Sequence, residues 1–504
     1  MKSNNLFIIL VLFLSAFSLR TFNLERGFFG DESITLSSVS KDLSKIIPSL
    51  VKNDMNPPLT SLLLSLWVKI NSSEVFIRFY FILFGLGALL IIYLIAIESV
   101  GKKVALLALF LGAISPMLIS LSQFIRNYID SAFWMLLSTY FLLLIVKNKG
   151  NRLAWFGYFL ATLLSIYTFY FSLILVFCQS LYVFIFMYKE KSTIKRWLLI
   201  QCCIFLAFIP WIKYLILQFS NSGSSIKLHW EKIGLKVAGI NIGIYARNVA
   251  SLFGMDHYFM VYPEGIKRHF SFLALLAISG LILAGLGFFL FFSLKWLKSE
   301  FKNDRKMIWF LPFFSLVPLL ISWLGARFMG VLPNARYLAA PHAISVILIS
   351  YFFYAIIKRH RKFGLILLGS LILLFGLRIP ASLTPIYEGN KALDFLRANL
   401  REGDGIVMVD RLPGRENLNI PSLNIEKNLY RRDPATSEYY ALPEADTNKI
   451  KDQISGFNRL WFIRCYGNTE IFGGNRIVYD FLKSCGRTES SSKEFNNIKV
   501  ILME

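Results

Sequence analysis

Two adjacent carboxylates and two separated arginines are the residues in this sequence best suited to chemistry. Asp31 and Glu32 follow the first apolar segment, within the stretch GFFGDESITLSS, and Arg126 and Arg336 lie at the ends of later apolar segments. A carboxylate can remove a proton from a hydroxyl or an amine, and guanidinium groups can stabilise an anion such as a phosphate. These side chains can act together only if the fold brings them to one face of the molecule.

Each of these residues also has a purely structural explanation. An acidic pair after an apolar segment is typical of a solvated helix start, with Asp31 or Ser33 as the cap and the helix beginning near Ser33. An arginine at a membrane edge commonly extends its charge into the headgroup region. The coincidence of acids and arginines on one predicted face is what favours a site over these explanations.

The composition is that of a membrane protein. Of the 504 residues, 55% are hydrophobic and 16% are aromatic, and the mean hydropathy is +0.55, which is more apolar than a soluble globular protein of ordinary composition. The formal net charge is 54 minus 31, or +23. Because the basic residues form short clusters between apolar runs and not one basic face, we expect no nucleic-acid partner.

Apolar runs long enough to cross a membrane recur along residues 1–379. A spanning helix needs about 20 apolar residues, and this length predicts about eleven spans. The continuous run 153–188 has no charged break and is interpreted as two of them, and the first run is interpreted as a span and not as a cleaved signal peptide. The predicted spans are near 6–22, 76–97, 104–121, 128–146, 153–170, 171–188, 197–217, 271–294, 307–325, 336–357 and 363–379.

Basic clusters occupy alternate connections between these runs, ending with Lys358, Arg359, Arg361 and Lys362. The positive-inside rule predicts that these connections and the N-terminus are cytoplasmic, in the inner (plasma) membrane of the cell. The first loop, residues 23–75, and the tail from residue 380 are then extracytoplasmic. Asp31, Arg126 and Arg336 would share this outer face, where a membrane can deliver a lipid-linked anion.

A pair of prolines opens a short apolar helix within the first outer loop. The stretch NPPLTSLLLSLW, Asn56 to Trp67, is too short for an ordinary span, and proline is well suited to the first turn of a helix. We expect this helix to lie in the membrane interface, with Trp67 as an anchor.

The fold class predicted is an all-α polytopic membrane domain, residues 1–379, followed by a small extracytoplasmic α/β domain, residues 380–504. In the tail, short β-rich runs such as GIVMVD and RLWFIRCY alternate with helical stretches such as KALDFLRANL. The tail has no phosphate-binding loop, metal-spaced cluster or nucleophile motif, so we expect a supporting role or acceptor recognition. Its two cysteines, Cys465 and Cys485, could pair in an oxidising compartment.

A series of short motifs occurs in a fixed order along the chain: DES-x-T, N-PPL-x-x-LLL-x-LW, SE-x-x-x-R, SP, SQ-x-x-R-x-Y, Y-T-x-Y-F and RYL-x-x-P. This order resembles the polytopic glycosyltransferases of GT-C architecture, the bacterial relatives of protein O-mannosyltransferases and of the lipid A aminoarabinose transferase. The resemblance covers most of residues 31–170 and returns at 336–341, and it leaves the tail unmatched. Members of that family move a sugar, a hexose or pentose unit, from a polyprenyl-phosphate carrier to a protein, lipid or glycan acceptor on the outer face.

The resemblance implies roles for particular residues. It implies that Asp31 is the catalytic carboxylate with Glu32 beside it, and that Arg126 and Arg336 bind the donor phosphate. The remaining motif residues would line the substrate site: Asn56, Tyr128, Tyr170 and Tyr337. Three positions depart from the usual pattern, because Asn56 stands where His or Lys is common, Phe124 where an acid is common, and Phe169 where His is common.

The reaction fits these residues independently. Displacing a polyprenyl phosphate from an anomeric carbon requires a base for the acceptor and cations for the leaving phosphate. Arginine can hold that phosphate without a metal, so we expect no cofactor and no metal site, although a divalent metal would be compatible. A single displacement would invert the anomeric centre.

Two other functions stay open at this point. A transporter or flippase for lipid-linked sugars would also be polytopic, but it should carry a duplicated half and ionisable groups near the bilayer midplane, which the sequence does not show. A glycan polymerase or ligase of similar architecture would differ only in its acceptor.

Overall fold

The structure is a computed structural model of the 504-residue chain. It describes residues 3–25, 30–39, 42–147, 149–251, 305–329, 335–383, 389–408, 454–465, 474–495 and 498–504, with gaps at single residues and with short strands and single residues between these ranges. For 222–251, 323–329, 335 and some shorter stretches it describes the backbone alone. Contacts divide the chain into two compact units: the first is Met1–Leu24, Thr35–Asn221 and Lys236–Leu383, and the second is Glu25–Ile34, Ser222–Leu235 and Thr384–Glu504.

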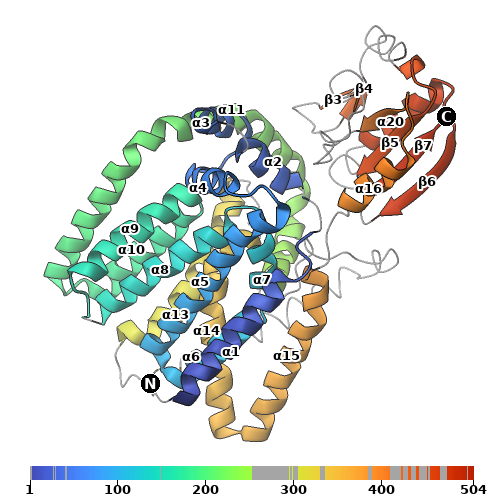
Figure 1. The fold of residues 1–504 in the computed structure, drawn as a ribbon. Coiled ribbons are helices and arrows are strands. Elements are labelled where there is room, and N and C mark those ends of the chain that lie inside the picture. The colour runs from blue at the N-terminus through green and yellow to red at the C-terminus, as the bar shows by residue number, and fades with distance from the viewer. Residues whose placement is uncertain are drawn as a thin grey trace. The chain divides into compact units, whose positions relative to one another are not determined.

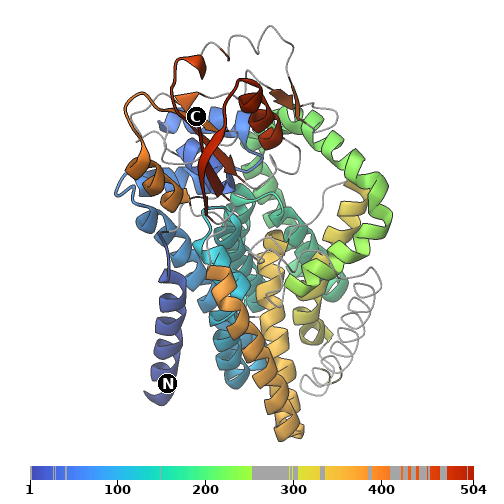
Figure 2. The same ribbon diagram turned by 90° about the vertical axis from the view of Figure 1, so that its right-hand side faces the viewer.

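The first unit is helical, and its long helices α5, α8 and α14 run side by side (Figure 1). Helices α14 and α15 form a hairpin, which is clear in both orientations (Figures 1 and 2). The boundary between the two units falls within helix α2, between Ile34 and Thr35. The helices are α1 (Ser3–Thr21), α2 (Gly30–Val39), α3 (Leu43–Asn53), α4 (Leu59–Val68), α5 (Glu74–Val100), α6 (Lys102–Ala113), α7 (Pro116–Gln123), α8 (Tyr128–Val146), α9 (Arg152–Thr168), α10 (Ser172–Met187), α11 (Lys191–Ser251), α13 (Arg305–Met329), the 3₁₀ helix η2 (Ala335–Leu338), α14 (Ala339–Arg359) and α15 (Arg361–Leu383).

Several of these helices could cross a membrane, which makes the protein a multi-pass membrane protein. By length and composition six of the described helices qualify, or seven if the bent pair α6 and α7 is one span. Three further predicted spans, matched by α1, α9 and α10, are helices of 19, 17 and 16 residues. The remaining predicted span, 271–294, lies outside the described residues. The count of eleven is therefore not established by the structure.

One predicted span, 104–121, is two helices and not one. The chain bends by 56° between α6 and α7. The bend falls at Ser115 and Pro116, and Pro116 is the first residue of α7. Proline lacks the N–H that a continuous helix would require there and disfavours the helical conformation of the residue before it. The run 153–188, by contrast, divides into α9 and α10 as predicted, and Tyr158 of α9 donates a hydrogen bond of 2.9 Å to Gln179 of α10.

The short helix after the proline pair is also present, as α4. It begins at Leu59, directly after Pro58. The Trp67 ring stacks on Phe76 with 4.8 Å between centroids, and its indole N–H donates to the Phe76 carbonyl at 2.8 Å. Trp67 therefore fixes the end of α4 against the start of α5, a contact that the sequence pattern did not indicate.

In the second unit, the chain from residue 389 forms a sheet between helices. The five strands have the order β2-β1-β5-β7-β6, with β1 parallel to β2 and β5, and β7 antiparallel to β5 and β6. A further two-stranded sheet pairs β3 with β4. The elements are α16 (Gly389–Asn399), β1 (Gly405–Met408), β2 (Ser422–Leu423), β3 (Tyr430–Arg432), β4 (Tyr439–Ala441), β5 (Leu460–Cys465), α20 (Gly474–Ser484), β6 (Glu489–Phe495) and β7 (Ile498–Met503).

Each face of this sheet packs against one helix. Alternate strand residues such as Ile406 and Trp461 pack with Leu396 of α16, whereas Val407 and Phe462 pack with α20 on the other face. This arrangement agrees with the α/β character predicted for the tail. The polar edge strand β6, sequence ESSSKEF, was not predicted because it has no apolar alternation. Cys485 is a free thiol in the structure, which does not support a disulfide with Cys465.

Candidate functional site

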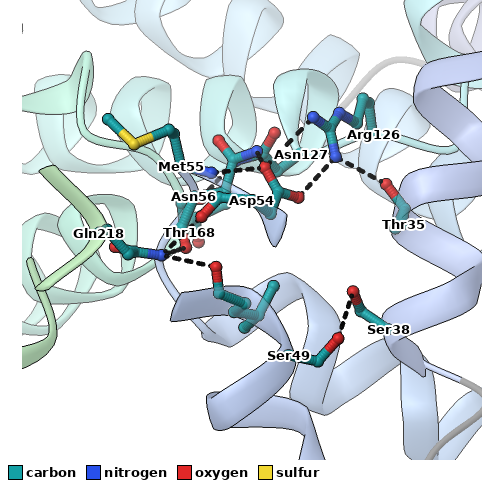
Figure 3. Close-up of polar contacts among 11 residues, drawn as sticks. Thr35, Ser38, Ser49, Asp54, Met55, Asn56, Arg126, Asn127, Thr168 and Gln218 are labelled. Atoms are coloured by element: carbon teal, nitrogen blue, oxygen red, sulfur yellow. Dashed lines mark hydrogen bonds and ion pairs between the residues drawn. The ribbon is translucent and has the colours of Figure 1, made fainter. Parts of the chain in front are cut away.

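The centre of the candidate site is an ion pair between Arg126 and Asp54. The Arg126 Nη1 atom lies 2.7 Å from Asp54 Oδ2, and Nη2 lies 3.3 Å from Oδ1, so the contact is two-pronged. Arg126 Nη1 also donates to the Thr35 hydroxyl at 3.0 Å, which connects helix α2 to the pair (Figure 3). The side chains of Arg126 and Asp54 are only 12% and 6% exposed, so the pair is largely withdrawn from solvent.

The loop that contains Asp54 is held in place by its own hydrogen bonds. Asp54 Oδ1 accepts from the Met55 backbone N–H at 2.8 Å and from Asn56 Nδ2 at 2.7 Å. Hydrogen bonds within the loop therefore orient the carboxylate that contacts Arg126. This places Asn56, the residue before the proline pair, within two hydrogen bonds of Arg126.

A second amide extends the network to the end of α9. Asn127 Nδ2 donates to Asn56 Oδ1 at 3.0 Å and to the Thr168 carbonyl at 2.6 Å (Figure 3). Asn127 directly follows Arg126, so one turn of chain after α7 contributes both a charged and a neutral donor. The loop before Pro57, the turn after α7 and the end of α9 are thus joined by hydrogen bonds.

Helix α11 closes this network from another side. Gln218 Nε2 donates to the carbonyls of Asp54 at 3.0 Å and Asn56 at 2.9 Å. Its Oε1 accepts from the Tyr170 hydroxyl at 2.5 Å, and that hydroxyl accepts from the Trp211 indole at 2.7 Å. Tyr170 therefore contacts the loop through Gln218 and not directly.

Arg336 lies in an aromatic cluster. Its guanidinium carbon is 5.2 Å from the ring centroid of Tyr128 and 5.8 Å from that of Tyr337. The two tyrosine rings are themselves 5.7 Å apart. Cations are attracted to the faces of aromatic rings, so these two rings orient the guanidinium group of Arg336.

Two of the departures from the family pattern meet in this same cluster. Phe124 stacks on Tyr128 with 6.0 Å between centroids, and Phe169 contacts both Tyr128, at 5.7 Å, and Tyr337, at 5.4 Å. Both phenylalanine rings therefore pack on Tyr128, one of the two tyrosine rings that contact Arg336.

The acidic pair lies in the first turn of α2. That helix begins at Gly30, three residues before the predicted start near Ser33, so Asp31 is inside the helix and not its cap. Glu32 is buried and Asp31 is half-buried. Carboxylates in a first turn are stabilised by the unpaired N–H groups and the helix dipole. Asp31 precedes Thr35, the partner of Arg126, by one helical turn.

The structure brings together part of the predicted set. Asn56 and Arg126 share one network, and Arg336 shares a cluster with Tyr128 and Tyr337. Tyr170 joins the first network through Gln218. Asp31 and Glu32 belong to the second unit, whereas the other predicted residues belong to the first.

Sequence reasoning missed several residues of the network, among them Asp54, Asn127 and Gln218. Asp54 could have been found, because it is an acid two residues before Asn56, which the motif N-PPL already marks as a site residue. Gln218 gave no such signal, because its contacts with residues 50–56 join positions more than 160 apart in the chain. Among the described residues, no three His, Cys, Asp or Glu side chains come close enough to hold a metal ion.

Residues 55–214 match the family of dolichyl-phosphate-mannose-protein mannosyltransferases. This segment contains Asn56, Arg126, Tyr128 and Tyr170. Among curated proteins, no sequence matches the chain.

Solved structures show the same fold. ArnT from Cupriavidus metallidurans bound to undecaprenyl phosphate is similar over 100% of this chain and 98% of its own, with a TM-score of 0.58 and 11% identity. The archaeal oligosaccharyltransferase AglB from Archaeoglobus fulgidus, in complex with an inhibitory peptide and a dolichol-phosphate, is similar over 92% of this chain and 69% of its own, with a TM-score of 0.54 and 14% identity. The family match and these folds together confirm the resemblance to GT-C glycosyltransferases that use polyprenyl-phosphate carriers.

Proposed function

We propose that this protein is a membrane glycosyltransferase that moves a sugar from a polyprenyl-phosphate carrier to a lipid, glycan or protein acceptor on the outer face of the plasma membrane. The observation that carries the proposal is the likeness in fold, over the whole chain, to a protein solved with undecaprenyl phosphate. The family match over residues 55–214 supports the same reaction class.

In the proposed reaction Asp31 takes the proton of the acceptor hydroxyl or amine. The acceptor atom forms a bond to the anomeric carbon while the bond from that carbon to the phosphate oxygen breaks, and the polyprenyl phosphate leaves with the electron pair. One such displacement inverts the anomeric centre. Glu32 lies beside the base in the sequence and supports it, and no cofactor or metal is required by this scheme.

Arg126 and Arg336 are proposed to bind the donor phosphate, with Asn56, Tyr128, Tyr170 and Tyr337 lining the site. Arg126 is already paired with Asp54, and Nη1 is shared between Asp54 and Thr35. An arginine has five N–H donors, so a guanidinium oriented by a carboxylate can still present donors to a phosphate. Arg336, held over two aromatic rings, would supply the second cation.

The proposal includes the topology of the chain. We propose eleven spans in residues 1–379, a cytoplasmic N-terminus and an extracytoplasmic domain at 380–504. Reporter fusions at residue 450 and within 358–362 should give opposite locations, with residue 450 on the same side as the first loop. A cytoplasmic residue 450 would remove the shared outer site on which the roles of Asp31 and Arg336 depend.

The central experiment compares glycans and lipids of cells that lack this protein with those of cells that carry it. One glycan or lipid should lose a single sugar, and the Asp31→Asn variant should restore almost none of it, since general bases contribute about 10²- to 10⁴-fold in rate. The Glu32→Gln variant should restore more. Full restoration by Asp31→Asn would remove Asp31 as the base, and accumulation of the carrier-linked sugar on the cytoplasmic side would favour a flippase.

The donor assignment is tested with purified protein and undecaprenyl phosphate alone. Arg336→Ala should weaken binding roughly ten- to hundredfold, because a hydrogen bond to a charged group contributes about 1.5 to 3 kcal/mol. Arg336→Lys should restore binding only in part, since lysine cannot make a forked contact. Arg359→Ala is the matched control, because Arg359 is an exposed arginine at the far end of the adjoining helix α14. Equal affinity of Arg336→Ala and this control would exclude Arg336 from the donor site.

A further inference from the structure

Two motifs that carry the family resemblance, SE-x-x-x-R and SQ-x-x-R-x-Y, contain residues without a role in the proposed reaction. These are Arg78 and Gln123, and the structure joins them. Arg78 Nη1 donates to the Gln123 carbonyl at 2.5 Å, although the residues are 45 positions apart. Both side chains are completely buried. A buried guanidinium is costly unless its donors are used, so their partners are informative.

Arg78 binds two chain segments at once. Besides the Gln123 carbonyl, its Nε donates to the Leu24 carbonyl at 3.1 Å. Its charge is balanced within α5, because Nη2 lies 2.8 Å from Glu74 Oε1. Leu24 is the last residue of the first unit before the segment 25–34, which contains the acidic pair. Gln123 ends α7, three residues before Arg126.

The Gln123 side chain makes the reciprocal connection. Its Nε2 donates to the carbonyls of Arg20 at 2.9 Å and Phe22 at 2.8 Å. These carbonyls lie at the end of α1, where no further helical N–H is available to satisfy them. The end of α1 is therefore tied to the end of α7 by one amide, and both are tied to α5 by Arg78.

Arg20 adds a third contact, to the bend between α6 and α7. It is completely buried. Its Nη1 donates to the Ala113 carbonyl at 3.0 Å and its Nε to the Ser122 hydroxyl at 3.2 Å. Helix α5 approaches this point closely, since a Cβ on Gly85 would lie 2.1 Å from the Ser122 Oγ. The bend and the end of α1 are thus packed as one piece.

We propose that Arg20, Arg78 and Gln123 form a buried clamp that fixes residues 20–24, from which the chain continues into the acidic segment 25–34, for transfer. The clamp fixes the last carbonyls before that segment, and its other side fixes the chain three residues before Arg126. It acts through the segment and touches neither donor nor acceptor, so these are positioning residues. The inference rests on the proposed function only in the statement that the positioning serves sugar transfer.

The first test is independent of any transfer reaction. In purified full-length protein, hydrogen exchange of the backbone at residues 22–34 should become about tenfold faster or more in Gln123→Met and in Arg78→Lys. Gln123→Met keeps the size of the side chain and removes its donors, and Arg78→Lys keeps the charge but cannot reach both carbonyls. Lys147→Met is the matched control, because Lys147 also contacts a glutamate and a backbone carbonyl of α5, at Glu98. Wild-type exchange in Gln123→Met, which changes no charge, would overturn the clamp.

The second test asks whether the clamp serves the reaction. Undecaprenyl phosphate should bind Gln123→Met within about threefold of the wild-type affinity, because Arg126 keeps its Asp54 contact, whereas sugar restored in cells should fall on the order of tenfold to a hundredfold.

The outcomes separate the two proposals. Faster exchange with wild-type sugar restoration would overturn the positioning role and leave the proposed function intact. If deletion of the protein removes no sugar from any glycan or lipid, the proposed function fails, and the exchange result still decides whether the clamp holds residues 22–34.

Discussion

The two ends of α5 hold charged residues in opposite ways. At its first turns Arg78 is completely buried against Glu74, whose side chain is 12% exposed. At its last turns Glu98 pairs with Lys147 and Lys149, and the three side chains are 22%, 26% and 55% exposed. One end therefore withdraws its charges from solvent and the other leaves them partly hydrated.

The same contrast continues around the helical unit. Asp54 and Arg126 lie with the buried set, whereas Glu190 and Lys306, which form an ion pair at the start of α11 and α13, are each more than a quarter exposed. Burying an ion pair costs several kcal/mol per charge in desolvation, so such pairs are weak evidence for a gain in stability. The end of the helical unit that buries these ion pairs also carries the sequence motifs. A need for fixed geometry at that end explains the desolvation cost better than a gain in stability does.

The largest expected effect comes from breaking the buried set at Arg78. Arg78→Met removes the donor from the carbonyls of Leu24 and Gln123 and leaves Glu74 without its cation. We expect a loss of about 3 to 5 kcal/mol in the free energy of unfolding, as for other buried pairs from which one partner is removed. Thermal unfolding in detergent, with Lys147→Met alongside, measures it. Equal losses of unfolding free energy in the two variants would show that the charges at the two ends of α5 do not differ in their contribution to stability.

A smaller effect is expected at the Asp54–Arg126 pair. Each single alanine variant should lose about 1.5 to 3 kcal/mol, because a charge-assisted hydrogen bond is removed and its partner remains in a mostly buried place. The double alanine variant should lose clearly less than the sum of the two, which gives the coupling energy of the pair. Additive losses would mean that Asp54 does not hold Arg126 in solution.

The smallest effect is expected at the opposite end. Glu98→Gln should change the free energy of unfolding by about 1 kcal/mol or less, because partly exposed ion pairs gain little over hydration. Raising the salt concentration should reduce even this difference, since solvent-exposed charges are screened. A loss as large as that of Arg78→Met would show that exposure does not separate the two sets of charges.

Much of the helical arrangement could be predicted because membrane helices are set by local properties. The apolar run 128–146 became α8 with the same bounds, and the proline pair placed the start of α4 at Leu59. The bend at Pro116 was missed because a window of apolar residues is insensitive to one proline. The polar strand β6 was missed for the opposite reason, since only its pairing with β7 makes it a strand.

The candidate site could be predicted in its residue types but not in its partners. Arg126 and Arg336 were recognisable from their motifs, yet their surroundings differ, one beside a carboxylate and the other over two aromatic rings. Asp54 and Gln218 reach the site from segments that the motifs do not link. A hydrogen bond tolerates a change of only a few tenths of an ångström in its donor–acceptor distance. The spacing of residues along the chain does not specify distances between four separate segments to that accuracy.

The sequence by itself determined that the chain crosses a membrane several times, that an α/β tail follows, and that acids and arginines recur in an order typical of one family. These properties follow from the length and apolarity of runs and from local motifs, which act through neighbouring residues alone. Tertiary structure decided which charges are buried, because desolvation depends on everything packed around a side chain and not on its neighbours in sequence. Arg78 and Gln123 stand in motifs of the sequence and Arg20 does not, and only the meeting of α1, α5 and α7 joins the three into a clamp.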